Sequence, residues 1–155
     1  MPRITVSHTA DLDAPAAKVY AVIADYVDGH PRILPPAFHD LTVEEGGVGA
    51  GTVIRFATRV LGRDTWARAR ITEPEPGRVL LESGLDDSDV VTTFTVDPLD
   101  GGRRARVTFD TVFTQGGAAG WVAKLVAPMV LRGVYRDEMA NLERVAGERG
   151  GTAAG

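Results

Sequence analysis

The sequence predicts an α+β fold in which a curved, seven-stranded antiparallel sheet wraps around a long C-terminal helix, with one or two short helices after the first strand. Two observations predict this fold. Short runs that alternate apolar and polar residues, separated by turn residues, fill most of the chain between residues 38 and 114, as expected for hairpin-linked strands. The last part of the chain instead carries apolar residues at helical spacing. An antiparallel sheet must cover its apolar face, and this helix is the available cover.

The N-terminal elements are a strand and a helix. Strict alternation over residues 4–12 predicts a half-buried strand. Apolar residues at helical spacing then predict a helix over about 14–26, and Asp13 is expected to cap its N-terminus. The segment Asp28-Gly29-His30-Pro31 ends this helix, and only a short helix or turn fits at residues 32–34.

Six further strands follow, each bounded by residues typical of turns. The glycine-rich segment Gly46–Gly51 would need a following helix and a lysine to hold a phosphate, but a strand pattern follows it and no lysine is near. It is therefore interpreted as a hairpin. The expected strands cover residues 41–44, 52–61, 65–72, 78–83, 90–96 and 104–114.

The chain from about Ala118 to Ala146 is expected to form one long helix with a kink at Pro128. Its first half is apolar nearly all round, so a loop containing Ile33, Leu34 and Phe38 is expected to cover it, with a homodimer as the weaker alternative.

Residues 1–146 are expected to form a single domain and 147–155 a disordered tail. The predicted core stripe of the helix comprises Trp121, Leu125, Pro128, Leu131, Tyr135, Met139, Leu142 and Val145.

Composition excludes several classes of protein. The 155 residues include no cysteine, which excludes disulfides, thiolate catalysis and cysteine-based zinc sites. The net charge of −4 and the pI near 5.3 argue against nucleic acid or an anionic membrane as the main partner. No apolar run is long enough to span a membrane, and the N-terminus lacks the apolar segment of a signal peptide, so we expect a cytoplasmic protein.

The order of elements and several short motifs resemble the START-like superfamily. These motifs are Asp13-Ala14-Pro15 with Lys18-Val19-Tyr20, Asp25-Tyr26 followed by Pro31 and Leu34-Pro35, the turn from Gly47 to Thr52, and Gly101-Gly102-Arg103 before a strand. This superfamily is also called SRPBCC, or polyketide cyclase/dehydrase and lipid transport, and has the Bet v1-like helix-grip fold. The resemblance covers residues 4–145 and implies that fold, but not one chemistry, because the superfamily includes carriers, cyclases and hydrolases.

Small side chains on the predicted inner face favour an internal cavity. Ala67 and Ala69 are too short to reach a helix across the layer spacing of about 10 Å, and threonines bring hydroxyls to the same face. We therefore expect a binding or carrier protein for a small hydrophobic, polyketide- or lipid-like molecule. The expected ligand-binding residues are Ile54, Phe56, Thr58, Ala67, Ala69, Thr92, Phe94, Phe109, Thr111, Trp121, Leu125 and Met129.

Two alternatives stay open, a polyketide cyclase or dehydratase that uses acid–base groups in the same cavity, and an interaction or chaperone-associated domain without ligand. For the enzyme, His39 would move protons while Tyr26 and Tyr135 hold oxygens. His39 shares the parity of Leu41 and Val43, which predicts that it points inward, whereas His30 in its turn is expected to be exposed.

No spacing of histidines indicates a metal site, no serine motif indicates a hydrolase, and no cofactor is expected. Glu82 can face either side, because its strand lacks clear alternation. The arginines of the strands are expected on a solvated outer face with cross-strand ion pairs, unless Arg68 or Arg70 turns inward. These arginines are Arg55, Arg59, Arg68, Arg70 and Arg106.

Overall fold

A computed structural model describes residues 3–60, 62–114 and 117–148, with the side chains of 60 and 117–128 left out. Within these residues the predicted order of elements is confirmed, including seven strands, two short helices after the first strand and a long last helix. The elements are β1 (Arg3–Leu12), α1 (Ala16–Ala24), α2 (Gly29–Ile33), β2 (Phe38–Glu45), β3 (Val53–Val60), β4 (Arg63–Glu75), β5 (Val79–Gly84), β6 (Val91–Leu99), the 3-10 turn η1 (Asp100–Gly102), β7 (Arg104–Thr114) and α3 (Gly117–Gly147).

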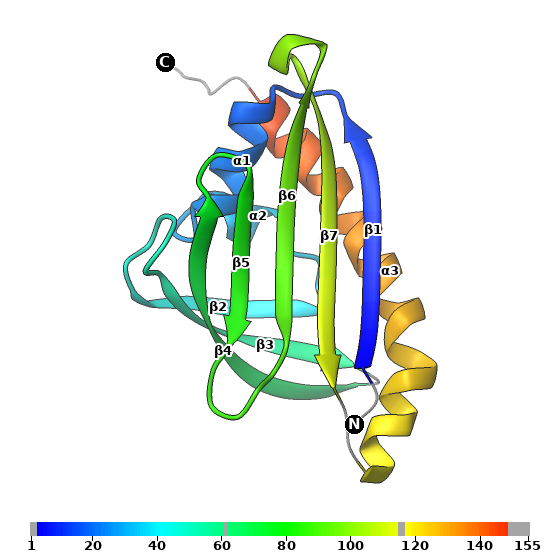
Figure 1. Cartoon of the computed structure of the whole chain (residues 1–155). Coiled ribbons are helices and arrows are strands. Elements are labelled where there is room, and N and C mark those ends of the chain that lie inside the picture. The colour runs from blue at the N-terminus through cyan, green and yellow to red at the C-terminus, as the bar shows by residue number, and fades with distance from the viewer. Residues whose placement is uncertain (1–2, 61, 115–116, 149–155) are drawn as a thin grey trace.

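The seven strands form one antiparallel sheet in the order β1-β7-β6-β5-β4-β3-β2. Every neighbouring pair after β1 is a hairpin between consecutive strands, while β1 closes against β7. The sheet is strongly curved, so that β2 and β3 run across the direction of β5, β6 and β7, and β4 bends from the one direction to the other (Figure 1). The helices lie on the concave side, with α3 packed along β1 and α1 against β6 and β7.

The strand register fixes which side chains face the helices. Thr92 of β6 pairs with Thr111 of β7, which pairs in turn with Val6 of β1. The next row contains Phe94 and Phe109, which are 3% and 0% exposed. Cross-strand partners share a face of the sheet, so these rows together form the inner wall on which the helices pack.

The segment after α1 is held by close backbone contacts. A Cβ on Gly29 would lie only 2.8 Å from the backbone oxygen of Val22, so glycine allows α2 to pack directly on α1. The backbone amide of Tyr26 donates to the carbonyl of Gly47, in the loop between β2 and β3. Asp13 does not cap α1 as predicted, because Pro15 occupies the N-cap position and its side chain offers no acceptor; the backbone amide of Asp13 donates instead to Glu143 of α3.

The outer face of the sheet carries the predicted ion pairs. Arg106 pairs with Asp11 across β7 and β1, and Arg68 pairs with both Glu44 and Asp86. The guanidinium of Arg55 lies 3.9 Å from the centre of the Trp66 ring. The expectation of a solvated outer face with cross-strand ion pairs is confirmed for these residues. The glycine-rich segment 46–51 joins the antiparallel strands β2 and β3, as the hairpin interpretation predicts.

No helix among the described residues is long and apolar enough to cross a lipid bilayer.

Candidate functional site

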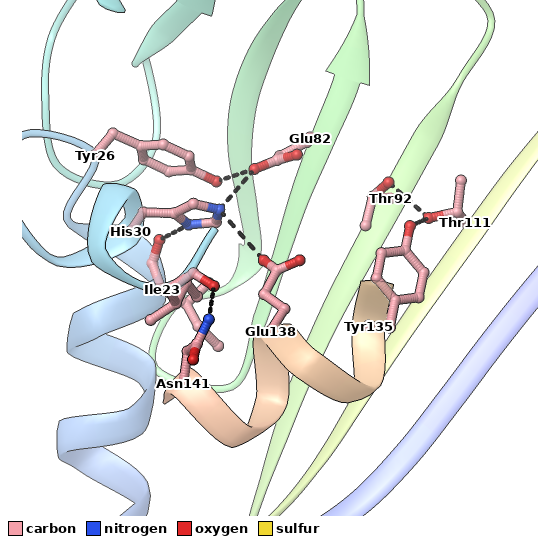
Figure 2. A network of polar contacts seen from close by, with 10 residues as sticks. Ile23, Tyr26, His30, Glu82, Thr92, Thr111, Tyr135, Glu138 and Asn141 are labelled. Carbon is pink, nitrogen blue, oxygen red and sulfur yellow. Dashed lines mark hydrogen bonds and ion pairs between the residues drawn. The ribbon is translucent and has the colours of Figure 1, made fainter. Parts of the chain in front are cut away.

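Four ionisable side chains meet inside the molecule, and we call them the acid–base cluster: Tyr26, His30, Glu82 and Glu138 (Figure 2). The Tyr26 hydroxyl donates to Glu82 Oε2 over 2.6 Å. His30 Nε2 lies 3.6 Å from the same oxygen and 3.8 Å from Glu138 Oε2. One imidazole nitrogen therefore faces two carboxyl groups, one from β5 and one from α3.

The orientation of His30 is set by its other nitrogen and by its ring contacts. Nδ1 lies 2.7 Å from the carbonyl oxygen of Ile23, which can only accept, so Nδ1 carries a proton. Nε2 is then the nitrogen that faces the two carboxyl groups. The imidazole stacks on the Tyr26 ring at 4.4 Å and meets the Phe94 ring edge-on.

Glu138 is the most deeply buried carboxyl of the cluster, at 2% exposed. Burial, and secondarily the nearby charge of Glu82, raises the pKa of Glu138 well above its ordinary value. This shift favours the protonated form of Glu138, which can donate a hydrogen bond or a proton. Burial likewise raises the pKa of Tyr26, next to the same carboxylate, so its phenol stays protonated.

Three hydroxyl groups form a second polar group, which we call the hydroxyl trio: Thr92, Thr111 and Tyr135 (Figure 2). The Thr92 and Thr111 Oγ1 atoms are 2.8 Å apart, and Thr111 Oγ1 also bonds to the Tyr135 hydroxyl. All three residues are buried, and burial raises the pKa of the Tyr135 phenol. The trio thus spans β6, β7 and α3.

The two polar groups are neighbours on one wall. Glu82 of β5 is the cross-strand partner of Thr92 of β6, so the carboxyl and the hydroxyl project from the same face. This register also resolves the open question of Glu82, which faces the helices. The rings of Phe94 and Phe109, 4.8 Å apart, lie between His30 and Tyr135. A row of polar groups therefore runs along an aromatic wall.

The structure brings Tyr26 and Tyr135 of the predicted catalytic residues inside, but not His39. The prediction for His39 is wrong because β2 contains a bulge: the pairing shifts by one residue between His39 and Thr42. Asp40 within it has a positive φ of 54°. His39 pairs with Ala57 on the outer face and binds Asp40 and Asp64 there, which raises the pKa of its imidazole.

The predicted ligand-binding residues fall into three groups. Met129 is 77% exposed, so the expectation that it faces the cavity is wrong. Trp121 and Leu125 lie outside the residues whose side chains are described. The others lie on the concave face or in its buried rows: Ile54, Phe56, Thr58, Ala67, Ala69, Thr92, Phe94, Phe109 and Thr111.

His30 and Glu138 are the functional candidates that the sequence interpretation missed. His30 is 2% exposed, against the expectation of an exposed turn, because Gly29 docks the short α2 onto α1 and turns the imidazole inward. Glu138 could have been found, since it follows Tyr135 by three residues and precedes Leu142 by four. Those steps place a carboxyl on the buried stripe of α3.

Comparisons with known proteins identify the family and the fold of the chain. The model of the polyketide cyclase / dehydrase and lipid transport family matches residues 3–147. Solved structures with the same fold include the KanY protein, with 29% identity over 96% of this chain and 100% of that one and a TM-score of 0.80. The aromatase/cyclase ZhuI from Streptomyces sp. R1128 has 27% identity over 99% of both chains and a TM-score of 0.71.

A START superfamily protein from Mycobacterium smegmatis has 15% identity over 91% of this chain and 98% of that one, with a TM-score of 0.72, and shares the fold alone. No curated protein sequence matches the chain. The family model covers nearly the whole chain, and the helix-grip fold agrees with it. The resemblance seen in the sequence is therefore confirmed, and the chain belongs to the polyketide cyclase/dehydrase and lipid transport family.

Proposed function

We propose that the protein binds a small, mostly apolar molecule that carries oxygen atoms, between the concave face of the sheet and α3. The observation that carries this proposal is the row of buried polar groups on the aromatic wall. A core normally holds apolar side chains at such positions, and a buried carboxyl such as Glu138 costs stability that a leucine would not cost. A binding site explains why polar groups stand at these buried positions.

The apolar end of the same wall supports the proposal. Phe38 and Phe56, whose ring centres are 6.0 Å apart, and Ala67, the cross-strand partner of Phe56, are only half-buried on the concave side. Their neighbour Ala69 is 5% exposed. Apolar surface that the protein itself leaves partly uncovered is suited to an apolar ligand, with the polar row as its anchor.

Filling this apolar end should block binding. We expect Ala67→Trp to weaken the binding of the uncharged dye Nile red by at least about tenfold, because the indole would take up the space that the dye needs. Nile red fluorescence measures the affinity, and circular dichroism checks the fold. Thr72→Trp is the matched control, since Thr72 lies on the outer face of the same strand and is exposed.

Native mass spectrometry of freshly purified protein tests the same proposal without a probe, by the mass of a retained small molecule. If the wild-type protein binds no Nile red and retains no molecule, or if Ala67→Trp binds as the wild type does, the binding proposal is wrong.

A second candidate function is acid–base catalysis of the cyclase or dehydratase type, favoured by the two unlike carboxyl groups at His30. Burial raises the pKa of Glu138 and so favours its protonated form, whereas Glu82 accepts a hydrogen bond from Tyr26. Elimination of water from a hydroxyketone needs both roles. Glu82 would take the proton from the carbon beside the ketone, the carbon–carbon double bond would form, and the hydroxyl would leave as water with the proton of Glu138.

Proton exchange at a model ketone tests this candidate. In heavy water, NMR measures how fast 1-tetralone exchanges its C2 protons for deuterium. We expect the wild-type protein to speed this exchange, because the Glu82 carboxylate removes a proton from the carbon next to the carbonyl. Glu82→Gln should slow the catalysed exchange by roughly a hundredfold, while Glu45→Gln, at an exposed position, should not. A protein that binds Nile red but does not speed exchange would refute catalysis and leave binding intact.

A further inference from the structure

Glu138 is a buried carboxyl group without a hydrogen bond. Its side chain is 3% exposed, and within the described part of the chain it bonds to no other group. His30 Nε2, which Oε2 faces, is 3.8 Å away and too far for a hydrogen bond, and no contact reaches the other oxygen in Figure 2. Buried polar groups are nearly always hydrogen-bonded, so this carboxyl group needs a partner.

Glu82 has one oxygen in the same condition. Its Oε2 accepts the hydrogen bond of Tyr26, whereas its Oε1 has no partner among the described residues. The side chain faces the helices, through the pairing with Thr92, and yet it is 15% exposed. Open space therefore reaches the Glu82 carboxyl group on the concave side of the sheet, where the ligand is proposed to lie.

The two carboxyl groups are close neighbours that offer different hydrogen bonds. Their Oε2 atoms lie 3.6 and 3.8 Å from the same nitrogen, His30 Nε2. Burial, and next the charge of Glu82, raises the pKa of Glu138, which favours the form that donates a hydrogen bond. Glu82 instead offers an oxygen that accepts one. A ligand group that meets both must accept one hydrogen bond and donate another.

A hydroxyl is the ligand group that suits both carboxyl groups. Its oxygen accepts a hydrogen bond and its proton donates one, whereas a ketone only accepts and an ammonium group only donates. A carboxylate would lose its hydration and gain no cation, because no lysine or arginine side chain is buried among the described residues. An ammonium group would also lose its hydration in this apolar interior.

We propose that the bound molecule carries a hydroxyl, of an alcohol or a phenol, which accepts a hydrogen bond from Glu138 and donates one to the second oxygen of Glu82. This inference rests on the proposed binding function and names the polar group of the ligand. It gives Glu138 a role in binding that does not depend on catalysis. The hydroxyl trio takes no part in it, because its three groups bond to one another.

Four matched bicyclic probes test the inference by displacement of Nile red. They are 2-tetralol, its methyl ether 2-methoxytetralin, tetralin without a polar group, and 2-aminotetralin, which is a cation at neutral pH. We expect the wild-type protein to bind 2-tetralol about a hundredfold more tightly than tetralin through two hydrogen bonds, and the ether about tenfold more tightly through one. The amine should bind at least about tenfold more weakly than 2-tetralol, because its charge loses hydration.

Variants of the two carboxyl groups separate the two hydrogen bonds. Glu138→Leu should lower the affinity for the ether to that for tetralin and weaken 2-tetralol by about tenfold, with tetralin unchanged. Asp137→Leu removes a carboxyl group at the next, exposed position of α3 and should keep every wild-type preference. Glu82→Gln should remove most of the preference for 2-tetralol over the ether, since its amide oxygen stays with Tyr26 and its amide nitrogen cannot accept.

Several results would overturn this inference alone. Equal affinity for 2-tetralol and tetralin in the wild type, or wild-type preferences in Glu138→Leu, would mean that Glu138 does not hold the hydroxyl. Equal affinity for 2-tetralol and its ether would refute the bond to Glu82, and tighter binding of the amine would show that the carboxyl groups hold a cation. Circular dichroism checks that the variants fold, and the wild-type series tests the inference without them. If neither Nile red nor any of the four probes binds, the proposed binding function itself is wrong.

Discussion

His30→Ala is expected to lower the free energy of unfolding by about 3 kcal/mol, whereas His39→Ala should change it by less than about 0.5 kcal/mol. His30 is buried, bonds to the Ile23 carbonyl, stacks on Tyr26 and faces two carboxyl groups. Its removal leaves a cavity between α1 and α3 and takes away the group that lies between Glu82 and Glu138.

Urea denaturation at pH 7, followed by circular dichroism, measures both changes. His39 is the matched control because its two carboxylate partners lie on the outer face, where solvent screens them. A loss of stability in His30→Ala no larger than that in His39→Ala would contradict the placement of His30 in the interior.

Glu138→Gln is expected to change how the stability of the protein depends on pH. The pKa of Glu138 is raised in the folded protein, mainly by burial, above the value of about 4.3 for an exposed glutamate. Below that value both states hold the proton, and the carboxyl adds no penalty. As the pH rises above it, the unfolded chain releases the proton and the folded chain keeps it. The free energy of unfolding then falls by up to about 1.4 kcal/mol per pH unit.

Glutamine cannot ionise, so the variant loses this contribution. We expect the free energy of unfolding of Glu138→Gln to rise relative to that of the wild type between pH 5 and pH 7, by up to about 1.4 kcal/mol per unit. Urea denaturation at several pH values gives the difference. Glu45→Gln, at an exposed site, should follow the wild-type curve. Parallel curves for Glu138→Gln and the wild type would show that the carboxyl ionises normally in the folded state.

The sheet could be predicted from the sequence because its signals are local. Alternation in β6 and β7 places Thr92, Phe94, Phe109 and Thr111 on one face, and the turns between strands fix the hairpins. The last helix was equally clear, from Ala118 to Ala146 in the prediction and Gly117–Gly147 in the structure. In these segments the intrinsic propensity of the residues and the burial of their apolar side chains favour the same secondary structure.

The site could be predicted only in part, because its chemistry depends on contacts between distant segments. A single extra residue in β2 turns His39 outward, and alternation alone carries no sign of that bulge. His30 lies in a five-residue helix whose position depends on the fit of Gly29 against Val22. Nothing in the local pattern around His30 predicts burial; the docking of two helices produces it.

The position of β1 at one edge of the sheet has a consequence for how the chain acquires its structure. Ile4 has its strand partner in Phe113, in the last strand of the chain, whereas the strands from β2 to β7 pair with their neighbours along the chain. Contacts between residues so far apart form slowly, since a long loop must close first. We expect the meander from β2 to β7 to assemble early and the N-terminal segment to join it late. β1 precedes the other six strands in the chain, so during translation it stays unpaired until β7 has been synthesised.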